Sequence, residues 1–219
     1  MTAAIVLAGG RSRRFGTDKL AARLADGRTV LAHGVAALES VASDLVVVVA
    51  PGARRPDDLP ARTVVVHDPE LDGGPLLGLA AGLEATGDEL VIVIGGDMPA
   101  LEPAVLRLLV ATVSGDPLVD AARLEVEPSA AGPVAVLPCV VRLEPARRAC
   151  RDAVAGGDRR LRACLERLTT AIVPAVEWRA LDPSGRTLLD IDRPADLARL
   201  QDPDGPKAGA PVERPLDQR

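Results

Sequence analysis

The sequence predicts an α/β domain with a mostly parallel central sheet and helices on both of its faces. Short runs of aliphatic and β-branched residues are bounded by turn residues, which is typical of strands buried on both faces. Segments with a helical spacing of apolar residues lie between these runs, and this alternation favours a parallel sheet. The length of 219 residues suits one such domain with a single sizeable core.

The first half of the chain contains four predicted strands and three predicted helices. The strands are expected at residues 4–7, 45–49, 63–66 and 90–94. The first two helices are indicated by apolar residues that share one helical side: Leu31, Val35, Leu38 and Ala42 in one, and Leu76, Ala80 and Leu83 in the other. The third is expected to begin at Pro103, because proline suits the first helical position.

The second half is less regular. Residues 116–133 are expected to form a loop or an irregular excursion, since they contain no stable period. Further elements are expected as a strand at 134–141, helices at 145–155 and 158–168 with Asp158 as an N-cap, strands at 171–176 and 187–191, and a short helix from Pro194. Residues 1–200 are therefore predicted to be one domain, and residues 201–219, rich in glycine and proline, a disordered tail.

Composition excludes several classes of function. The net charge is −5 and the only aromatic residues are Phe15 and Trp178, which weighs against binding of nucleic acid. The three cysteines lack C-x-x-C spacing, so zinc sites and a disulfide framework are not expected. No apolar run approaches the ~18 residues of a membrane span and no export signal is visible. A cytoplasmic protein without membrane partners is expected.

The first predicted strand leads directly into a segment suited to polyphosphate. Gly9 and Gly10 allow close approach of the backbone to a ligand. Four cations follow within nine residues: Arg11, Arg13, Arg14 and Lys19. The spacing matches neither a P-loop nor the dinucleotide motif G-x-G-x-x-G. The alternative is a surface turn with solvated charges.

Carboxylates follow two other predicted elements. Asp97 comes after the most apolar strand and could bind Mg²⁺, or could shape the turn and cap the next helix. Asp190 and Asp192 lie on the same side of an extended segment and could complete a metal site with Asp97. Asp192 could instead cap the helix at Pro194.

Two further features are candidates for nucleotide contact. Gly74 and Gly78 lie at the start of the second predicted helix, where they could close over a nucleotide or simply form a tight turn. Asp68 ends the third predicted strand.

Four motifs together resemble the molybdenum cofactor guanylyltransferase family, within the wider nucleotidyltransferase superfamily. They are the segment from Leu7 to Lys19, Gly-Pro-Leu-Leu-Gly at 74–78, Gly-Asp-Met-Pro at 96–99 and Asp-x-Asp-x-Pro-x-Asp-Leu at 190–197. The resemblance implies a Rossmann-like three-layer fold and transfer of GMP from GTP to the molybdopterin form of the molybdenum cofactor, with Mg²⁺. Molybdoenzymes or cofactor chaperones are candidate protein partners.

The resemblance also implies roles for individual residues. Leu7, Ala8, Gly9 and Gly10 would hold the guanine and ribose, with Asp68 beside the nucleoside. Lys19 would reach the phosphates and Asp97 would bind Mg²⁺. The family usually has Asn-x-Asn where this chain has Asp190-x-Asp192, and the carboxylate form is commoner in the sister cytidylyltransferases. Gly9 and the segment 74–78 favour guanine.

The residue inventory suits phosphoryl-type transfer, which depends on positioning and charge neutralisation. Lys19 and one or more of Arg11, Arg13 and Arg14 are expected to hold the departing pyrophosphate, while Asp97, with Asp190 or Asp192, holds the metal. Two alternatives remain open: transfer of another nucleotide, such as CMP, or to another phosphate acceptor, and a non-catalytic nucleotide-binding module. The identity of the NTP incorporated distinguishes among the enzymes.

Overall fold

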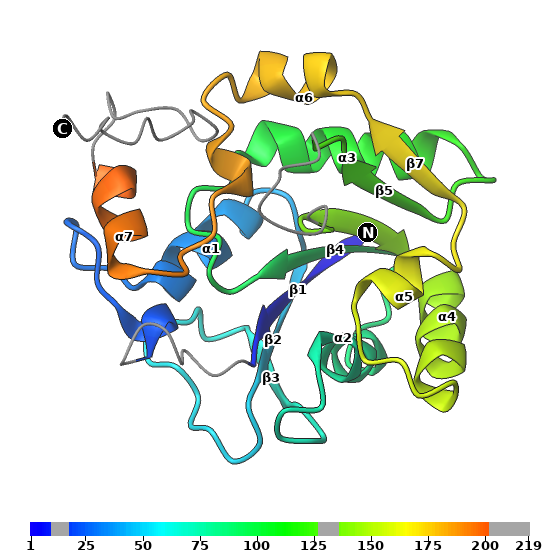
Figure 1. Ribbon diagram of the computed structural model, residues 1–219, viewed down its shortest axis with the longest axis horizontal. Coiled ribbons are helices and arrows are strands. Elements are labelled where there is room, and N and C mark those ends of the chain that lie inside the picture. Colours follow the sequence, from blue (N-terminus) through cyan, green and yellow to red (C-terminus); the bar gives the residue numbers. More distant parts are fainter. Residues whose placement is uncertain (10–17, 127–135, 202–219) are drawn as a thin grey trace, which may run out of the picture.

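The computed structural model describes residues 1–9, 18–126 and 136–201. Seven strands form one sheet in the order β3-β2-β1-β4-β6-β5-β7, with helices on both faces (Figure 1). The predicted three-layer α/β architecture is confirmed.

The parallel half of the sheet contains the four strands predicted in the first half of the chain. They are β1 (Thr2–Ala8), β2 (Asp44–Val49), β3 (Val64–His67) and β4 (Leu90–Gly95). β1 pairs in parallel with both β2 and β4, so it lies at the centre of this half. Every residue of β4 is buried, as the unbroken apolar run predicts.

The other half consists of β6 (Cys139–Arg142), β5 (Ala121–Leu124) and β7 (Thr170–Val173). β6 is antiparallel to both of its neighbours, β4 and β5. β5 therefore points in the same direction as β4, and β7 is parallel to β5. The carboxyl ends of all strands except β6 consequently lie at one edge of the sheet.

Two separate hydrophobic layers attach the helices to the sheet. On one face α1 (Val30–Leu38), α3 (Pro103–Gly115) and α6 (Ala175–Leu181) contribute buried residues to one cluster. On the other face α2 (Pro75–Glu84), α4 (Leu143–Ala155) and α5 (Arg162–Leu165) contribute to a second (Figure 1). The alternating residues of each central strand supply both clusters, as expected for a sheet covered on both sides.

A third, smaller cluster connects the beginning and the end of the chain. Ile191 is fully buried against Leu24 and Val30, and Leu197 and Leu200 of α7 (Pro194–Gln201) pack against them. The helix expected from Pro194 is thus confirmed. This cluster holds the segment around Ile191 beside the segment that follows η1 (Lys19–Ala21).

The prediction of an irregular segment at 116–133 is wrong in part, because β5 lies within it. Its sequence, Ala-Ala-Arg-Leu, contains no aliphatic run, and only pairing with β6 and β7 makes it a strand. The strand expected at 134–141 is shorter than predicted, since β6 begins at Cys139. Residues 134 and 135 lie outside the described residues.

Two other predictions for the second half need correction. The helix expected at 158–168 is reduced to α5, and the Asp158 carboxylate accepts from the Arg160 amide at 2.9 Å instead of capping it. The strand expected at 171–176 ends at Val173, and α6 follows Pro174. Trp178 of α6 is buried and its indole N–H donates to the carbonyl of Glu125 at 3.0 Å, a tertiary contact that favours the helix.

The strand expected at 187–191 is absent from this described part of the chain. The 3-10 turn η2 (Arg186–Leu188) replaces it, because Asp182 accepts a hydrogen bond from the Thr187 amide at 2.7 Å. The Thr187 hydroxyl is buried and accepts from the Glu102 amide at 3.1 Å. The tail was predicted at 201–219; Gln201 is the last residue of α7, and residues 202–219 lie outside the described residues. No described helix is long and apolar enough to cross a membrane.

Candidate active site

The candidate site lies at the carboxyl ends of β1 and β4, where the strand order reverses. The chain proceeds outward from β1 to β2 and β3, then returns to β4 on the other side of β1. Open α/β sheets bind ligands in the crevice at such a switch point. Gly9 follows β1, and the Gly96 amide after β4 donates to the carbonyl of Leu7 at 3.0 Å. This contact holds the beginning of the segment after β4 against the end of β1.

Lys19 connects two of the predicted carboxylates. Its Nζ lies 2.6 Å from Oδ2 of Asp97 and 3.1 Å from Oδ1 of Asp192. The Asp18 carboxylate begins η1 by accepting from the Leu20 amide at 3.0 Å, which fixes the backbone from which Lys19 extends. Burial acts to lower the pKa of Lys19, but the hydrogen bonds and charges of Asp97 and Asp192 outweigh it and raise the pKa. Lys19 is therefore a stable cation at neutral pH.

Asp97 is positioned by its backbone neighbours. A Cβ atom at Gly95 would lie 2.5 Å from Oδ1 of Asp97, so this carboxylate position requires glycine there. The carbonyl of Asp97 accepts from the Ile191 amide at 2.9 Å. The alternative role of capping α3 belongs to Glu102, whose carboxylate accepts from the Ala104 amide at 3.2 Å.

Asp190 and Asp192 flank the buried Ile191, in the segment before α7 whose Ile191 amide donates to the Asp97 carbonyl. The amides of Asp192 and Arg193 both donate to the Asp196 carboxylate, at 3.1 and 2.7 Å. Asp196 thus supplies the hydrogen bonds at the beginning of α7, while the Asp192 side chain contacts Lys19. Burial raises the pKa of Asp190, and the negative charges of Asp192 and Asp97 raise it further.

The donor chemistry of this cluster fits a magnesium ion. No group of three or more histidine, cysteine or acidic side chains is arranged to hold a metal among residues 1–9, 18–126 and 136–201. Mg²⁺ bound to a nucleotide needs only one or two protein carboxylates, because phosphate oxygens and water complete its shell. Burial is the main cause of the raised pKa of Asp190, and the negative charges of Asp192 and Asp97 add to it; a bound cation would relieve this charge repulsion. Asp97 with Asp190 or Asp192 is therefore a suitable donor set.

Asp68 and two glycines come together on the other side of β1. The Asp68 amide donates to the Val49 carbonyl at 2.8 Å, and its Oδ1 accepts from the Glu70 amide at 3.1 Å. A Cβ atom at Gly78 would lie 3.3 Å from Oδ2 of Asp68, and one at Gly9 would lie 3.7 Å from it. Because these two positions have no side chain, the Asp68 carboxylate lies close to the carboxyl end of β1, where Leu7 and Ala8 are.

Gly74 has a structural explanation of its own. Its φ is +87°, and a Cβ atom there would lie 2.7 Å from the carbonyl oxygen of Arg159. The same carbonyl accepts from the Leu76 amide at 3.2 Å. Packing of the segment before α5 against the start of α2 therefore requires glycine at this position.

Four predicted site residues, Gly10, Arg11, Arg13 and Arg14, lie outside the described residues. The sequence reasoning missed the supporting roles of Ile191 and Asp196. The signal for Ile191 was its place between two acidic residues, since a single apolar residue in that position needs a buried contact. The signal for Asp196 was its place three residues after Arg193, because an acidic side chain in the first turn of a helix can accept from the amide of the residue that precedes the helix.

Gly9 after β1, Lys19 beside Asp97 after β4, and Asp192 on the same ammonium group form the kind of site expected of a nucleotidyltransferase. Residues 4–172 match the family described as the MobA-like NTP transferase domain. The chain belongs to this family.

Relatives agree with this assignment. The chain is 35 % identical over 204 residues to a probable molybdenum cofactor guanylyltransferase from Chloroflexus aggregans, covering 92 % of this chain and 94 % of the relative. A similar protein from Methanosarcina mazei is 29 % identical over 90 % of this chain and 88 % of its own length.

Solved structures share the fold. Molybdopterin-guanine dinucleotide biosynthesis protein A from Archaeoglobus fulgidus superposes with a TM-score of 0.69 at 24 % identity, over 91 % of this chain and 96 % of that one. The 2-C-methyl-D-erythritol 4-phosphate cytidylyltransferase from Thermus thermophilus gives 0.65 at 20 % identity, over 91 % and 97 % of the two chains. At these identities the likeness concerns the fold.

Proposed function

We propose that this chain transfers GMP from GTP to the molybdopterin form of the molybdenum cofactor and releases pyrophosphate. The 35 % identity to a probable guanylyltransferase along nearly the whole length of both proteins supports the substrates. The observation that carries the chemistry is the contact of Lys19 with Asp97 and Asp192 at the carboxyl ends of the strands. It combines a cation for phosphate with carboxylates for a metal.

Lys19 neutralises charge on the phosphates. Because its pKa is raised, it remains an ammonium group when a triphosphate enters the crevice. A fixed cation near the phosphates stabilises the charge that develops on the departing pyrophosphate. Arg11 and Arg14, close to Lys19 in the sequence, are proposed to contribute further positive charge to the same group.

The acceptor needs no general base from the protein. A phosphate monoester has a second pKa near ~6 and is largely a dianion at neutral pH. One of its oxygens attacks the α-phosphorus of GTP, and the bond from that phosphorus to the bridging oxygen of pyrophosphate breaks. The task of the chain is to orient both phosphates and to reduce their repulsion.

Magnesium is the proposed cofactor. Asp97, together with Asp190 or Asp192, would hold it at the crevice. The bound ion would polarise phosphate oxygens and neutralise their charge.

Asp68 and the glycines beside it are proposed to contact the nucleoside. Gly9 and Gly78 leave room for a nucleoside to approach Asp68, which directly follows β3. Guanine presents N–H donors on its pairing edge, and a carboxylate or backbone carbonyls can accept from them. With so few aromatic residues in the chain, hydrogen bonding of this kind is the available means of recognising the base.

Thermal unfolding with each of the four NTPs and Mg²⁺ tests the nucleotide. We expect GTP to raise the melting temperature most, since a ligand at 100 times its Kd adds about 2.7 kcal/mol. Pyrophosphate release from GTP in the presence of molybdopterin then tests the transfer. Equal or stronger stabilisation by CTP would indicate the sister cytidylyltransferase activity instead.

A further inference from the structure

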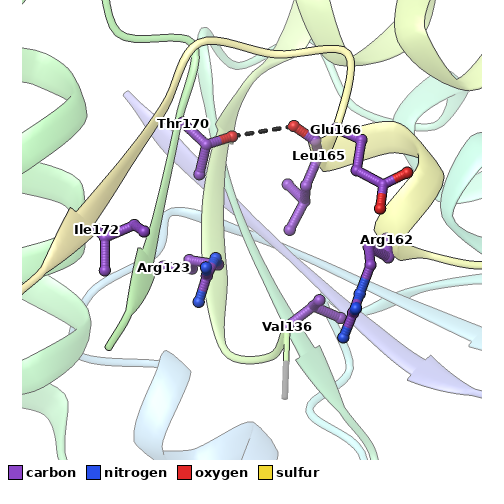
Figure 2. A pocket seen from close by; sticks show the side chains of 7 residues that line it. All are labelled: Arg123, Val136, Arg162, Leu165, Glu166, Thr170 and Ile172. Carbon is purple, nitrogen blue, oxygen red and sulfur yellow. Dashed lines mark hydrogen bonds between the residues drawn. The ribbon is translucent and has the colours of Figure 1, made fainter. Parts of the chain in front are cut away.

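A second pocket lies on the α2, α4 and α5 side of the sheet, away from the Lys19 crevice. It has a volume of about 320 Å³ and lies between β5, β7 and α5 (Figure 2). Arg123 and Ile172, which are register partners on β5 and β7, line it from the sheet. Nothing in the mechanism above uses these residues.

The two ends of this pocket differ in chemistry. In Figure 2 the guanidinium groups of Arg123 and Arg162 lie on either side of Val136 at one end. Glu166 and Thr170 line the other end. The Thr170 hydroxyl donates to the Leu165 carbonyl at 3.1 Å, which closes that end by joining β7 to α5.

Strand direction relates the pocket to the active site. Ala121 pairs with Thr170, and Arg123 pairs with Ile172 two residues further along the strands. The arginine end of the pocket is therefore nearer to the carboxyl edge of the sheet than the threonine end. Asp97 follows β4 at the same edge, and its carboxylate contacts Lys19. Only β6 separates β5 from β4, and two interstrand spacings amount to roughly 10 Å. Arg123 is level with Val93 of β4 through Cys139 of β6, so the arginine end is the end of the pocket on the side of the edge at which Asp97 follows β4.

We propose that this pocket binds the acceptor through its fused-ring portion. Arg123 and Arg162 would face the anionic sulfur atoms, and Glu166 would accept from the ring N–H groups. This inference rests on the proposed function. Molybdopterin bears its reacting phosphate at one end, anionic dithiolene sulfurs in the middle and a pterin with amide and amino N–H groups at the other end. Along the pocket, the two arginines and then Glu166 offer groups complementary to the sulfurs and the pterin in this order.

The surroundings suit such a ligand. Val136, Leu165 and Ile172 provide apolar contacts for flat rings. Arg123 and Arg162 are both half-buried, which strengthens their interaction with an anion relative to fully solvated cations. The volume is at the lower end of the range for small-molecule sites, which fits a bicyclic or tricyclic ring system.

Steady-state transfer with purified molybdopterin and GTP, in the full chain, tests the assignment. The variants are Arg123→Gln and Glu166→Gln, each of which removes a charge with little change in size. We expect the KM for molybdopterin to rise by about tenfold or more in each, as for loss of a charged hydrogen bond. The KM for GTP should remain within about twofold, because these residues lie on the far side of β6 from the Lys19 crevice.

Arg167→Gln is the matched control. Arg167 is exposed on the same segment, next to Glu166, and donates to the Ala163 carbonyl at 2.7 Å without lining the pocket. We expect wild-type KM values. An equal rise in the KM for molybdopterin in this variant would show that general positive charge, and not the pocket, attracts the acceptor, and the assignment would fail.

Fluorescence titration with pterin-6-carboxylate separates the pocket from the reaction. We expect the wild type and Arg167→Gln to bind this probe, and Glu166→Gln to bind it about tenfold more weakly. If the wild type transfers GMP but both pocket variants keep the wild-type KM for molybdopterin, the pocket assignment is wrong and the proposed function stands. If the probe binds through Glu166 while the wild type transfers no GMP to molybdopterin, the proposed function is wrong and the pterin site stands.

Discussion

The ammonium group of Lys19 lies 2.6 Å from the carboxylate of Asp97, although the two residues are 78 positions apart in the sequence. Asp192, a further 95 positions along, contacts the same ammonium at 3.1 Å. The free protein therefore holds a cation of its own between carboxylates proposed to bind Mg²⁺.

Replacement of Asp97 by asparagine should separate catalysis from folding. Asparagine keeps the size of the side chain but removes the charge proposed to hold the metal, so we expect turnover to fall by about a thousandfold. The melting temperature should change by no more than about 3 °C, because Asp192 still neutralises Lys19 and the pair is partly exposed. Pyrophosphate release and thermal unfolding measure the two effects. Near wild-type turnover would remove Asp97 from the site.

Replacement of Lys19 by glutamine should have opposite effects on nucleotide and metal. We expect weaker binding of GTP, since a phosphate contact is lost. In the absence of nucleotide, Mg²⁺ should bind about tenfold more tightly, because the ammonium no longer lies between Asp97 and Asp192. Calorimetric titration measures both affinities, with Arg23→Gln as a control for loss of one nearby exposed charge. Unchanged or weaker binding of Mg²⁺ would contradict a shared position.

Ile191→Ala should impair both stability and activity. Ile191 is fully buried between the two acidic residues, and its amide donates to the Asp97 carbonyl at 2.9 Å. We expect a loss of about 2–5 kcal/mol in unfolding free energy, or roughly 5–15 °C in melting temperature. At temperatures well below the melting temperature of the variant, its turnover should still be lower than that of the wild type, because the segment that contains Asp190 and Asp192 loses its buried contact. Ile191→Val should lose only about 1 kcal/mol and keep its activity.

Asp182 should contribute to stability in a pH-dependent manner. It is 6 % exposed and accepts from the Ser184 hydroxyl and the Thr187 amide, each at 2.7 Å. Burial acts to raise the pKa of Asp182, but these hydrogen bonds outweigh it and lower the pKa below the usual value. The ionised form therefore stabilises the fold above about pH 4, and this contribution is lost as the pH falls through the lowered pKa.

Unfolding free energies of the wild type and Asp182→Asn at pH 7 and pH 3 measure this contribution. We expect the variant to be less stable by about 1 kcal/mol at pH 7, and the difference to shrink at pH 3. Asp44→Asn, at the exposed start of β2, should show no such pattern. A difference that grows toward pH 3 would contradict the lowered pKa.

The parallel half of the sheet was predictable because each of its strands is a run of apolar residues: β1, β2 and β4 are largely buried, and only the edge strand β3 is partly exposed. Leu90–Gly95 is buried at every position, and no other environment suits such a segment. Ala121–Leu124 has no comparable run, so its strand conformation depends on β6 and β7 on either side. The stretch 187–191 looks like a strand by composition, yet the hydrogen bonds of Asp182 and Thr187 turn the chain there. Local pattern predicts structure where burial alone selects it, and fails where a distant partner does.

The sequence by itself determined the fold class and the motifs that contain Lys19, Asp97, Asp190 and Asp192, because glycines, charges and strand ends are local features. Only the tertiary structure decided how these residues meet. It placed the Lys19 ammonium between Asp97 and Asp192, used Asp196 at the start of α7, and brought Arg123 and Glu166 to one pocket from separate elements. The physical reason is that sheet order and the packing of the buried Ile191 set these distances, and both depend on contacts between residues far apart in the chain.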